Sequence, residues 1–116
     1  MGRLTNQQII GKLFPILKKA LLQVPKQFDA KDFYGHPYSE TVIDGHRVVY
    51  TEWSRDHITV EVVMPLEGKF DHATVCAVIR NGEVISYEYA KEFRGLGNGF
   101  YAELDENGKI IKSEWD

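Results

Sequence analysis

The sequence has one cysteine and four prolines in 116 residues, and it lacks a long uninterrupted hydrophobic run. The single Cys76 excludes an internal disulfide and is typical of a reducing compartment. No apolar stretch approaches the roughly 20 residues that a membrane-spanning helix needs. Lysines at positions 12, 18 and 19 interrupt the N-terminal apolar pattern, which is therefore unlike a signal peptide. We expect a soluble, cytoplasmic protein that does not insert into a membrane.

Residue patterns that identify a metal site or a nucleophile are also missing. Zinc sites use closely spaced ligand pairs such as His-x₃-His or Cys-x₂-Cys, and the histidines form no such pair. They stand at positions 36, 46, 57 and 72. Cys76 lies in an apolar run, and an apolar setting raises a thiol pKa and makes the thiol inert. We expect no metal and no cofactor, and we favour a protein that is not an enzyme.

Acidic residues are absent from the first 26 positions. That segment carries five cations, a charge of +5, whereas the nine Lys/Arg and seventeen Asp/Glu of the remainder give −8. We interpret the cations as the hydrated face of a helix. The later strands are rich in glutamate, which repels a phosphate backbone, so direct nucleic-acid binding is not expected.

An amphipathic helix is predicted over residues 5–24. Thr5 and Gln8 fit a capping box, and nine apolar residues fall on one arc about 160° wide. Those residues are Ile9, Ile10, Leu13, Phe14, Ile16, Leu17, Ala20, Leu21 and Val24. Pro15 lies on the opposite side of the helix, and Pro25 marks its end.

Period-two runs recur through residues 40–116 and predict antiparallel strands. They are joined by Asp44-Gly45, Asn81-Gly82 and Asn107-Gly108, which are typical hairpin turns. The apolar run at 74–79 is expected in a central strand, and Ile85, Tyr87 and Tyr89 are expected to share one face. The fold class predicted is α+β: a single domain, 1–116, with one N-terminal helix packed on a curved antiparallel sheet of about six strands.

The segment from Phe100 to Ile111, FYAELDENGKII, resembles the closing hairpin of nuclear-transport-factor-two-like cone folds. Such folds use three N-terminal helices, for which this chain has no room. A cystatin-like arrangement fits the order of elements better. Both are likenesses of fold alone, and neither implies a site.

A connection at 25–39 contains four aromatic residues, whereas loops are usually polar. One interpretation is a lid that folds back on the core, which we favour; the other is a binding surface. For the binding surface the candidate residues are Phe33, Tyr34, His36 and Tyr38.

Two functions are consistent with these features. The first is a small intracellular interaction module of bacterial or phage type that regulates or inhibits a protein partner, such as one that binds nucleic acid. Its acidic sheet or its aromatic connection would make the contact, and a homodimer is also compatible. The alternative is a small-molecule-binding or catalytic cone-type domain with a cavity between helix and sheet. Its polar groups would be His46, Asp71, His72 and Tyr87.

Overall fold

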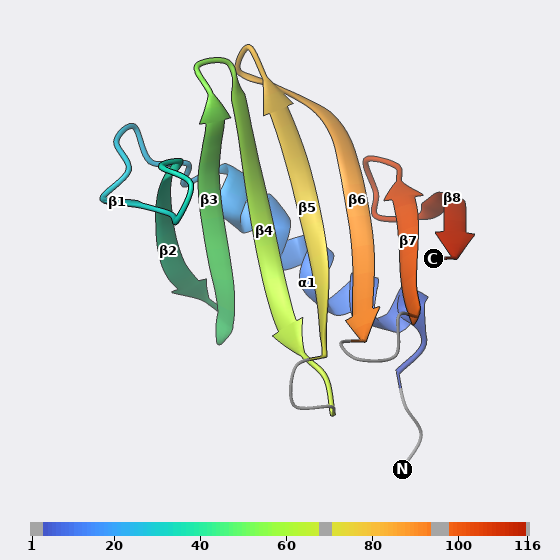
Figure 1. Ribbon diagram of the computed structural model, residues 1–116. Coiled ribbons are helices and arrows are strands. Elements are labelled where there is room, and N and C mark those ends of the chain that lie inside the picture. The colour runs from blue at the N-terminus through green and yellow to red at the C-terminus, as the bar shows by residue number, and fades with distance from the viewer. Residues whose placement is uncertain (1–3, 68–70, 94–97, 116) are drawn as a thin grey trace.

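One helix packs on one face of a single antiparallel sheet in the computed structural model (Figure 1), which describes residues 4–67, 71–93 and 98–115. The eight strands of this described part pair in chain order, so the sheet is a meander. The elements are α1 (Asn6–Leu21), β1 (Ala30–Lys31), β2 (Pro37–Ile43), β3 (His46–Ser54), β4 (His57–Pro65), β5 (His72–Arg80), β6 (Glu83–Phe93), β7 (Asn98–Leu104) and β8 (Ile110–Trp115). The α+β class with an antiparallel sheet is confirmed. In the described ranges no helix is both long and apolar enough to cross a membrane.

The capping box predicted at the start of α1 is present. The N–H of Gln8 donates to Thr5 Oγ1 at 3.1 Å, and the Thr5 N–H donates to Gln8 Oε1 at 2.8 Å. At the other end the helix stops at Leu21 rather than at residue 24. Val24 precedes Pro25, and the proline ring disfavours the helical conformation for the residue before it. The connection therefore begins earlier than predicted.

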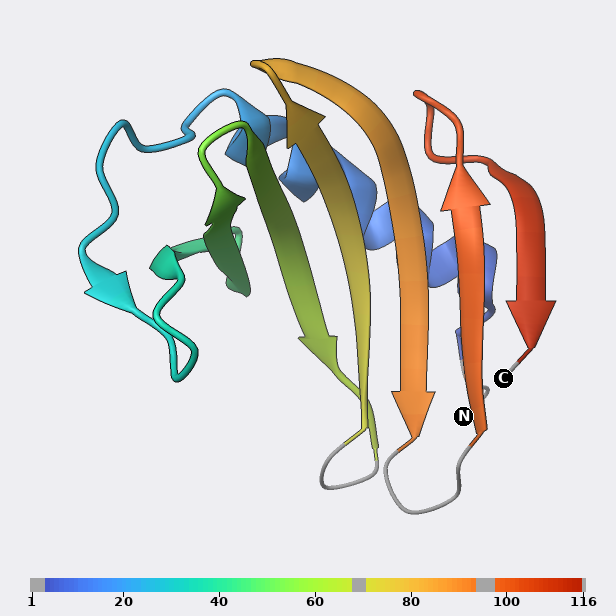
Figure 2. The ribbon, with the colours of Figure 1, turned by 45° about the horizontal axis from the view of Figure 1, so that its top comes forward.

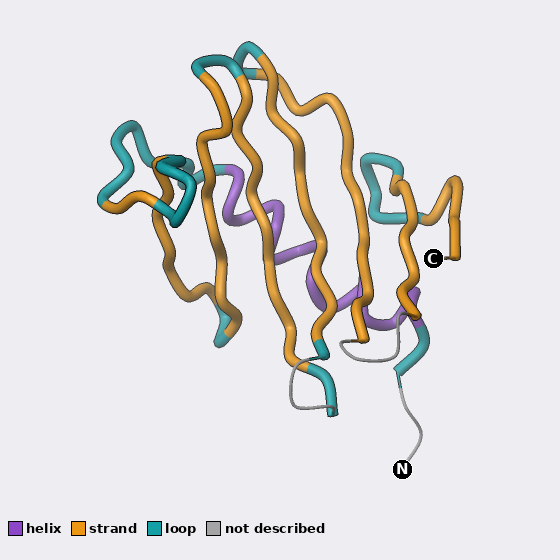
Figure 3. Tube along the Cα trace, viewed as in Figure 1, coloured by secondary structure: helices purple, strands orange, loops and turns teal. Residues whose placement is uncertain are grey.

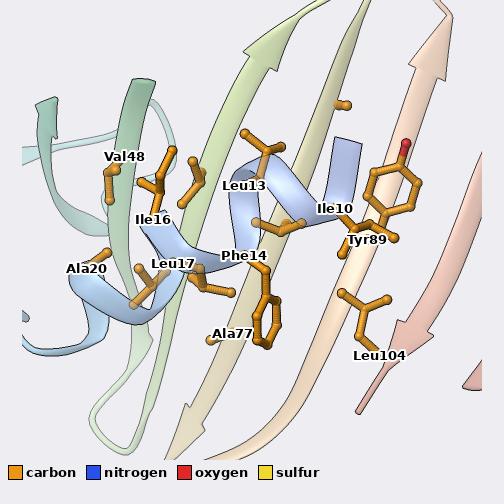
Figure 4. Packing of buried hydrophobic residues seen from close by; sticks show 14 of the residues in the cluster. Ile10, Leu13, Phe14, Ile16, Leu17, Ala20, Val48, Ala77, Tyr89 and Leu104 are labelled. Atoms are coloured by element: carbon orange, nitrogen blue, oxygen red, sulfur yellow. The ribbon is translucent and has the colours of Figure 1, made fainter. Parts of the chain in front are cut away.

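The core lies between α1 and the sheet. Seven of the nine residues of the predicted arc are buried, and the other two, Leu21 and Val24, are partly buried against the core. The apolar side chains of α1 are packed over the strands (Figure 4), and Leu13, Leu17 and Ala20 are fully buried. α1 crosses behind the strands at an angle to them (Figure 3). Two hydroxyls fix its ends: Tyr89 Oη donates to Asn6 Oδ1 at 2.9 Å, and Tyr50 Oη donates to the Ala20 carbonyl at 2.9 Å.

The described residues form eight strands rather than about six, and one of the additional strands, β1, lies inside the predicted connection. β1 pairs Ala30 with Tyr38 and Lys31 with Pro37, so β2 begins three residues before the predicted start at residue 40. Pro37 is the first residue of β2, where a proline is tolerated in a strand. This hairpin stands out at one edge of the sheet (Figure 2). Pairing with residues distant in sequence, rather than local pattern, decides such short strands.

A bulge changes the predicted face of β6. Val78 pairs with Ser86 while Ile79 pairs with Val84, which leaves Ile85 as the extra residue. Ile85 was predicted to share one face with Tyr87 and Tyr89, but it has no register partner on β5 and is 57% exposed; Val84 stands opposite the buried Ile79 in its place.

The sheet face turned away from α1 is called the open face below. Burial alternates along β4 and β5, with Val62 and Val75 beneath the helix and their neighbours on the other side. The register then places these residues on the open face: Tyr38, Glu40, Arg47, Val49, Thr51, Thr59, Glu61, Val63, Thr74, Cys76, Val78, Ser86, Glu88, Ala90, Tyr101 and Glu103. These side chains have no helix over them.

Candidate functional site

Four aromatic rings stand in series at the β1–β2 end of the open face. Ring centroids are 5.3 Å apart for Phe33 and Tyr34, 6.4 Å for Tyr34 and His36, and 4.7 Å for His36 and Trp53. Tyr38 lies two residues beyond His36 on β2, opposite Thr51 of β3. These five residues are called the aromatic cluster. Ring contacts join three of the predicted binding residues, Phe33, Tyr34 and His36, to Trp53, whereas Tyr38 is placed beside them by strand register alone.

Asp32 organises the tip of the hairpin that carries the cluster. Its Oδ1 accepts from the N–H groups of Tyr34 at 2.9 Å and His36 at 2.8 Å, and its Oδ2 lies 3.1 Å from His36 Nδ1. The Gly35 N–H donates to the Asp32 carbonyl at 3.0 Å, and Gly35 has a φ of 86°, which a side chain would disfavour. The tip is thus held by a network centred on one carboxylate.

The carboxylate of Asp32 is kept charged by this network. Partial desolvation raises the pKa of Asp32. The N–H groups of His36 and Tyr34 and the His36 ring together lower it by more, so the pKa lies below the ordinary 3.8. At neutral pH Asp32 is therefore an acceptor for all of its donors. Asp105 does the same for the β7–β8 turn, where donation by the Lys109 and Asn107 N–H groups lowers its pKa.

The aromatic residues of the connection divide into two groups. Phe28 is half-buried and packs against the core, as a lid residue would. Phe33 and Tyr34 are 94% and 81% exposed. Large apolar rings at this exposure contribute little to the core, so their placement has to be explained by something other than burial within this chain.

Trp53 is the member of the cluster that sequence reasoning missed. Its Nε1 donates to Thr59 Oγ1 at 2.8 Å, and its ring lies between Thr59 and His36. Period-two alternation from Thr51 places Trp53 on the open face, and that signal was available in the sequence. Its contact with His36 was not, because it depends on how the β1–β2 hairpin folds over β3.

Glutamates form a row across the centre of the open face. Glu61 pairs with Cys76, Cys76 with Glu88, and Glu88 with Glu103. Desolvation raises the pKa of Glu61 even though the Arg47 charge lowers it, and burial likewise raises the pKa of the Cys76 thiol, with Glu61 and Glu88 adding to the effect. Cys76 is half-buried in a central strand, and its raised pKa is that of an unreactive thiol.

Tyr101 extends this polar surface toward β7. Burial raises the pKa of Tyr101 to about 12, and the neighbouring Glu88 carboxylate, which accepts its hydrogen bond, adds to the rise. At the other end of the row, the Arg47 guanidinium donates to Glu40 at 2.6 Å and lowers the pKa of that carboxyl.

The four polar residues of the alternative function are not brought together. Tyr87 lies on the helix side, with its ring 5.1 Å from that of Phe14 and its hydroxyl 3.2 Å from Lys18 Nζ. His72 is on the opposite side of the sheet, where it pairs with Glu92 at 3.4 Å.

His46 and Asp71 sit at separate connections. His46 begins β3, and its Nδ1 lies 3.1 Å from the Asp44 carbonyl. Asp71 precedes β5, and its carbonyl accepts from the Leu66 N–H. In the ranges that the structure describes, no three His, Cys, Asp or Glu side chains are grouped to hold a metal ion.

Comparisons with protein-family models, curated proteins and solved structures gave no match for this chain.

Proposed function

We propose that this protein is a small interaction module that regulates or inhibits a protein partner, and that the aromatic cluster is its contact surface. The observation that carries the proposal is the pair Phe33 and Tyr34, which are 94% and 81% exposed on a tip whose backbone N–H groups are hydrogen-bonded to Asp32. Aromatic side chains are enriched at the centres of protein interfaces, where a few of them supply most of the binding energy.

The fixed tip favours binding because less freedom is lost when a partner arrives. Ordering a side chain or loop on binding costs affinity, and a contact surface ordered beforehand avoids part of that cost. The His36 ring packs against the Trp53 ring at a tilt of 56°, and Trp53 is in turn hydrogen-bonded to Thr59 of the sheet. The cluster thus rests on the rigid part of the fold, which we propose to be a cystatin-like arrangement.

The charge of the surroundings favours a partner with a basic surface. The open face beside the cluster carries glutamates on β2, β4, β6 and β7, and complementary charge speeds association and excludes acidic partners. A protein that binds nucleic acid has such a surface, so inhibition of a nucleic-acid-binding protein fits the proposal. A second copy of this chain is the alternative partner.

The double variant Phe33→Ala/Tyr34→Ala tests the proposal. We expect its affinity for a partner captured from cell extract and then purified to fall at least about tenfold, because the two rings are the exposed anchors. Isothermal calorimetry gives the affinity, and thermal unfolding should change little.

Leu22→Ala is the matched control, since Leu22 is 87% exposed at the other end of the connection, outside the cluster. It should bind normally. If the double variant binds as tightly as the unchanged protein, the cluster is not the contact surface. If it unfolds, the tip serves as a lid on the core, which was the interpretation that the sequence favoured.

A further inference from the structure

The glutamate row on the open face is unfavourable for the isolated domain. Glu88 and Glu103 are direct cross-strand partners on one face, and neighbouring strands are about 4.8 Å apart. Like charges placed directly opposite each other in an antiparallel pair destabilise it. A row that weakens the sheet is expected to have a use outside the sheet.

Glu61 adds a second unfavourable feature in the same row. Its register partners on the flanking strands are Val49 and Cys76, so the carboxylate stands among poorly hydrated neighbours. The nearby cation Arg47 already donates to Glu40 at 2.6 Å. The other charged groups that act on Glu61 are His72 and Glu92, which have opposite signs when His72 is protonated. A partner's cation would find Glu61 partly desolvated, where charge interactions are stronger than in water.

Three exposed lysines of the protein lie away from the open face, on α1. Lys12, Lys18 and Lys19 are on the outer side of α1, and Lys19 is already 2.6 Å from Asp44. On β8, Lys112 is the register partner of Glu103 and ends the row. The centre of the open face is therefore acidic.

The row and the aromatic cluster adjoin each other on β4. Trp53 Nε1 donates a hydrogen bond to Thr59 Oγ1. Thr59 and Glu61 are two residues apart on the same face of β4, a spacing of about 6.8 Å along the strand. One ligand can therefore contact the rings and the carboxylates together.

We propose that the open face binds an extended basic segment of the protein partner, with arginine or lysine side chains on Glu61 and Glu88 and a further side chain against Trp53. This inference rests on the proposed function and specifies the chemistry of the partner. Charge complementarity selects the occupant, since a nucleic-acid backbone would be repelled by the row. Arginine suits both parts of the site, because its guanidinium binds carboxylates bidentately and stacks on aromatic rings.

The test uses a fluorescein-labelled peptide of alternating arginine and threonine, with the same peptide carrying citrulline in place of arginine as the neutral probe. At physiological salt we expect saturable binding of the arginine peptide alone, measured by fluorescence anisotropy. The double variant Glu61→Gln/Glu88→Gln should weaken it at least about tenfold. Glu83→Gln/Glu106→Gln removes the same net charge at the first residue of β6 and in the β7–β8 turn, and it should weaken binding less than about twofold.

Several results would overturn the inference. Equal weakening by the two double variants would mean that only net charge matters. Binding of the citrulline peptide would mean that charge does not matter. A homodimer seen by light scattering, whose dissociation by Glu61→Gln/Glu88→Gln exposes the face, would make a second copy the occupant. Glutamine keeps the shape of glutamate, so the circular dichroism spectrum of each variant should match that of the unchanged protein. If Glu61→Gln/Glu88→Gln fails to fold, the single variant Glu88→Gln decides the question. Its binding of the arginine peptide should then be at least about threefold weaker.

Failure here is distinguishable from failure of the proposed function. If the arginine peptide does not bind but Phe33→Ala/Tyr34→Ala still loses the natural partner, the aromatic cluster is a contact surface and the glutamate row is not. If the arginine peptide binds and Phe33→Ala/Tyr34→Ala keeps the natural partner, the glutamate row is a contact surface and the aromatic cluster is not.

Discussion

The two faces of the sheet are built on the same strands and differ in almost every physical respect. On β4, Val60 and Val62 are fully buried beneath α1, while the residue between them, Glu61, faces the other way and is only half-buried. On β5, Ala73, Val75 and Ala77 lie under the helix, and Cys76 lies on the open face. The comparison indicates that one face stabilises the domain and leaves the other available for contacts.

The helix face is stabilised by burial and by hydrogen bonds at both ends of α1. Burying a large apolar side chain contributes about 1.5–3 kcal/mol, and this face buries most of those in the chain. The open face carries features that oppose folding: a desolvated Glu61 and the opposed Glu88 and Glu103. Substitutions on the two faces should therefore have different consequences.

The largest effect is expected from Leu17→Ala. Leu17 is fully buried between α1 and the sheet, and removing such a leucine costs about 2–5 kcal/mol of unfolding free energy. Urea unfolding measures it, with Leu22→Ala as a control that should stay within about 0.5 kcal/mol of the unchanged protein. A loss below about 1 kcal/mol for Leu17→Ala would show that the helix is peripheral to stability.

A smaller loss is expected from Gly108→Ala, which pushes a methyl group into the helix face. Gly108 has a φ of 83°, and a Cβ there would lie 2.8 Å from Phe14 Cγ. Gly82 has a φ of 80° with nothing within 4 Å, so Gly82→Ala carries the backbone strain alone, about 1 kcal/mol.

The crowding of Phe14 should add about 1–3 kcal/mol in Gly108→Ala over Gly82→Ala, measured by urea unfolding of both. Equal losses would mean that α1 moves away freely, and that the helix face is less tightly packed than the structure indicates.

The sequence allowed the local features to be predicted. Asp44-Gly45 and Asn81-Gly82 have positive φ at both residues, as the hairpin signal required, and the cap at Thr5 and the buried arc of α1 follow from spacing alone. β1 and the bulge at Ile85 were missed because both depend on pairing between strands. Alternation predicts which face a strand residue occupies, but a one-residue bulge shifts the alternation for the residues beyond it, and no sequence signal marks the bulge.

The candidate site was predictable in composition and not in geometry. Phe33, Tyr34, His36 and Tyr38 could be chosen as aromatic or polar residues in a connection. Their joint position depends on Asp32, whose carboxylate accepts from two N–H groups of the tip, and on Trp53, which comes from another strand. The glutamate row is also a matter of register, since its members come from three separate strands.

The most direct test of the difference between the faces is a methyl NMR titration with the arginine peptide. Valine methyls report on both sides of single strands: Val62 and Val75 lie beneath α1, and Val63 and Val78 lie on the open face. We predict that the Val63 and Val78 methyl signals shift on titration while those of Val62 and Val75 stay in place. Shifts confined to Val62 and Val75 would contradict the account and would instead favour a ligand bound between helix and sheet.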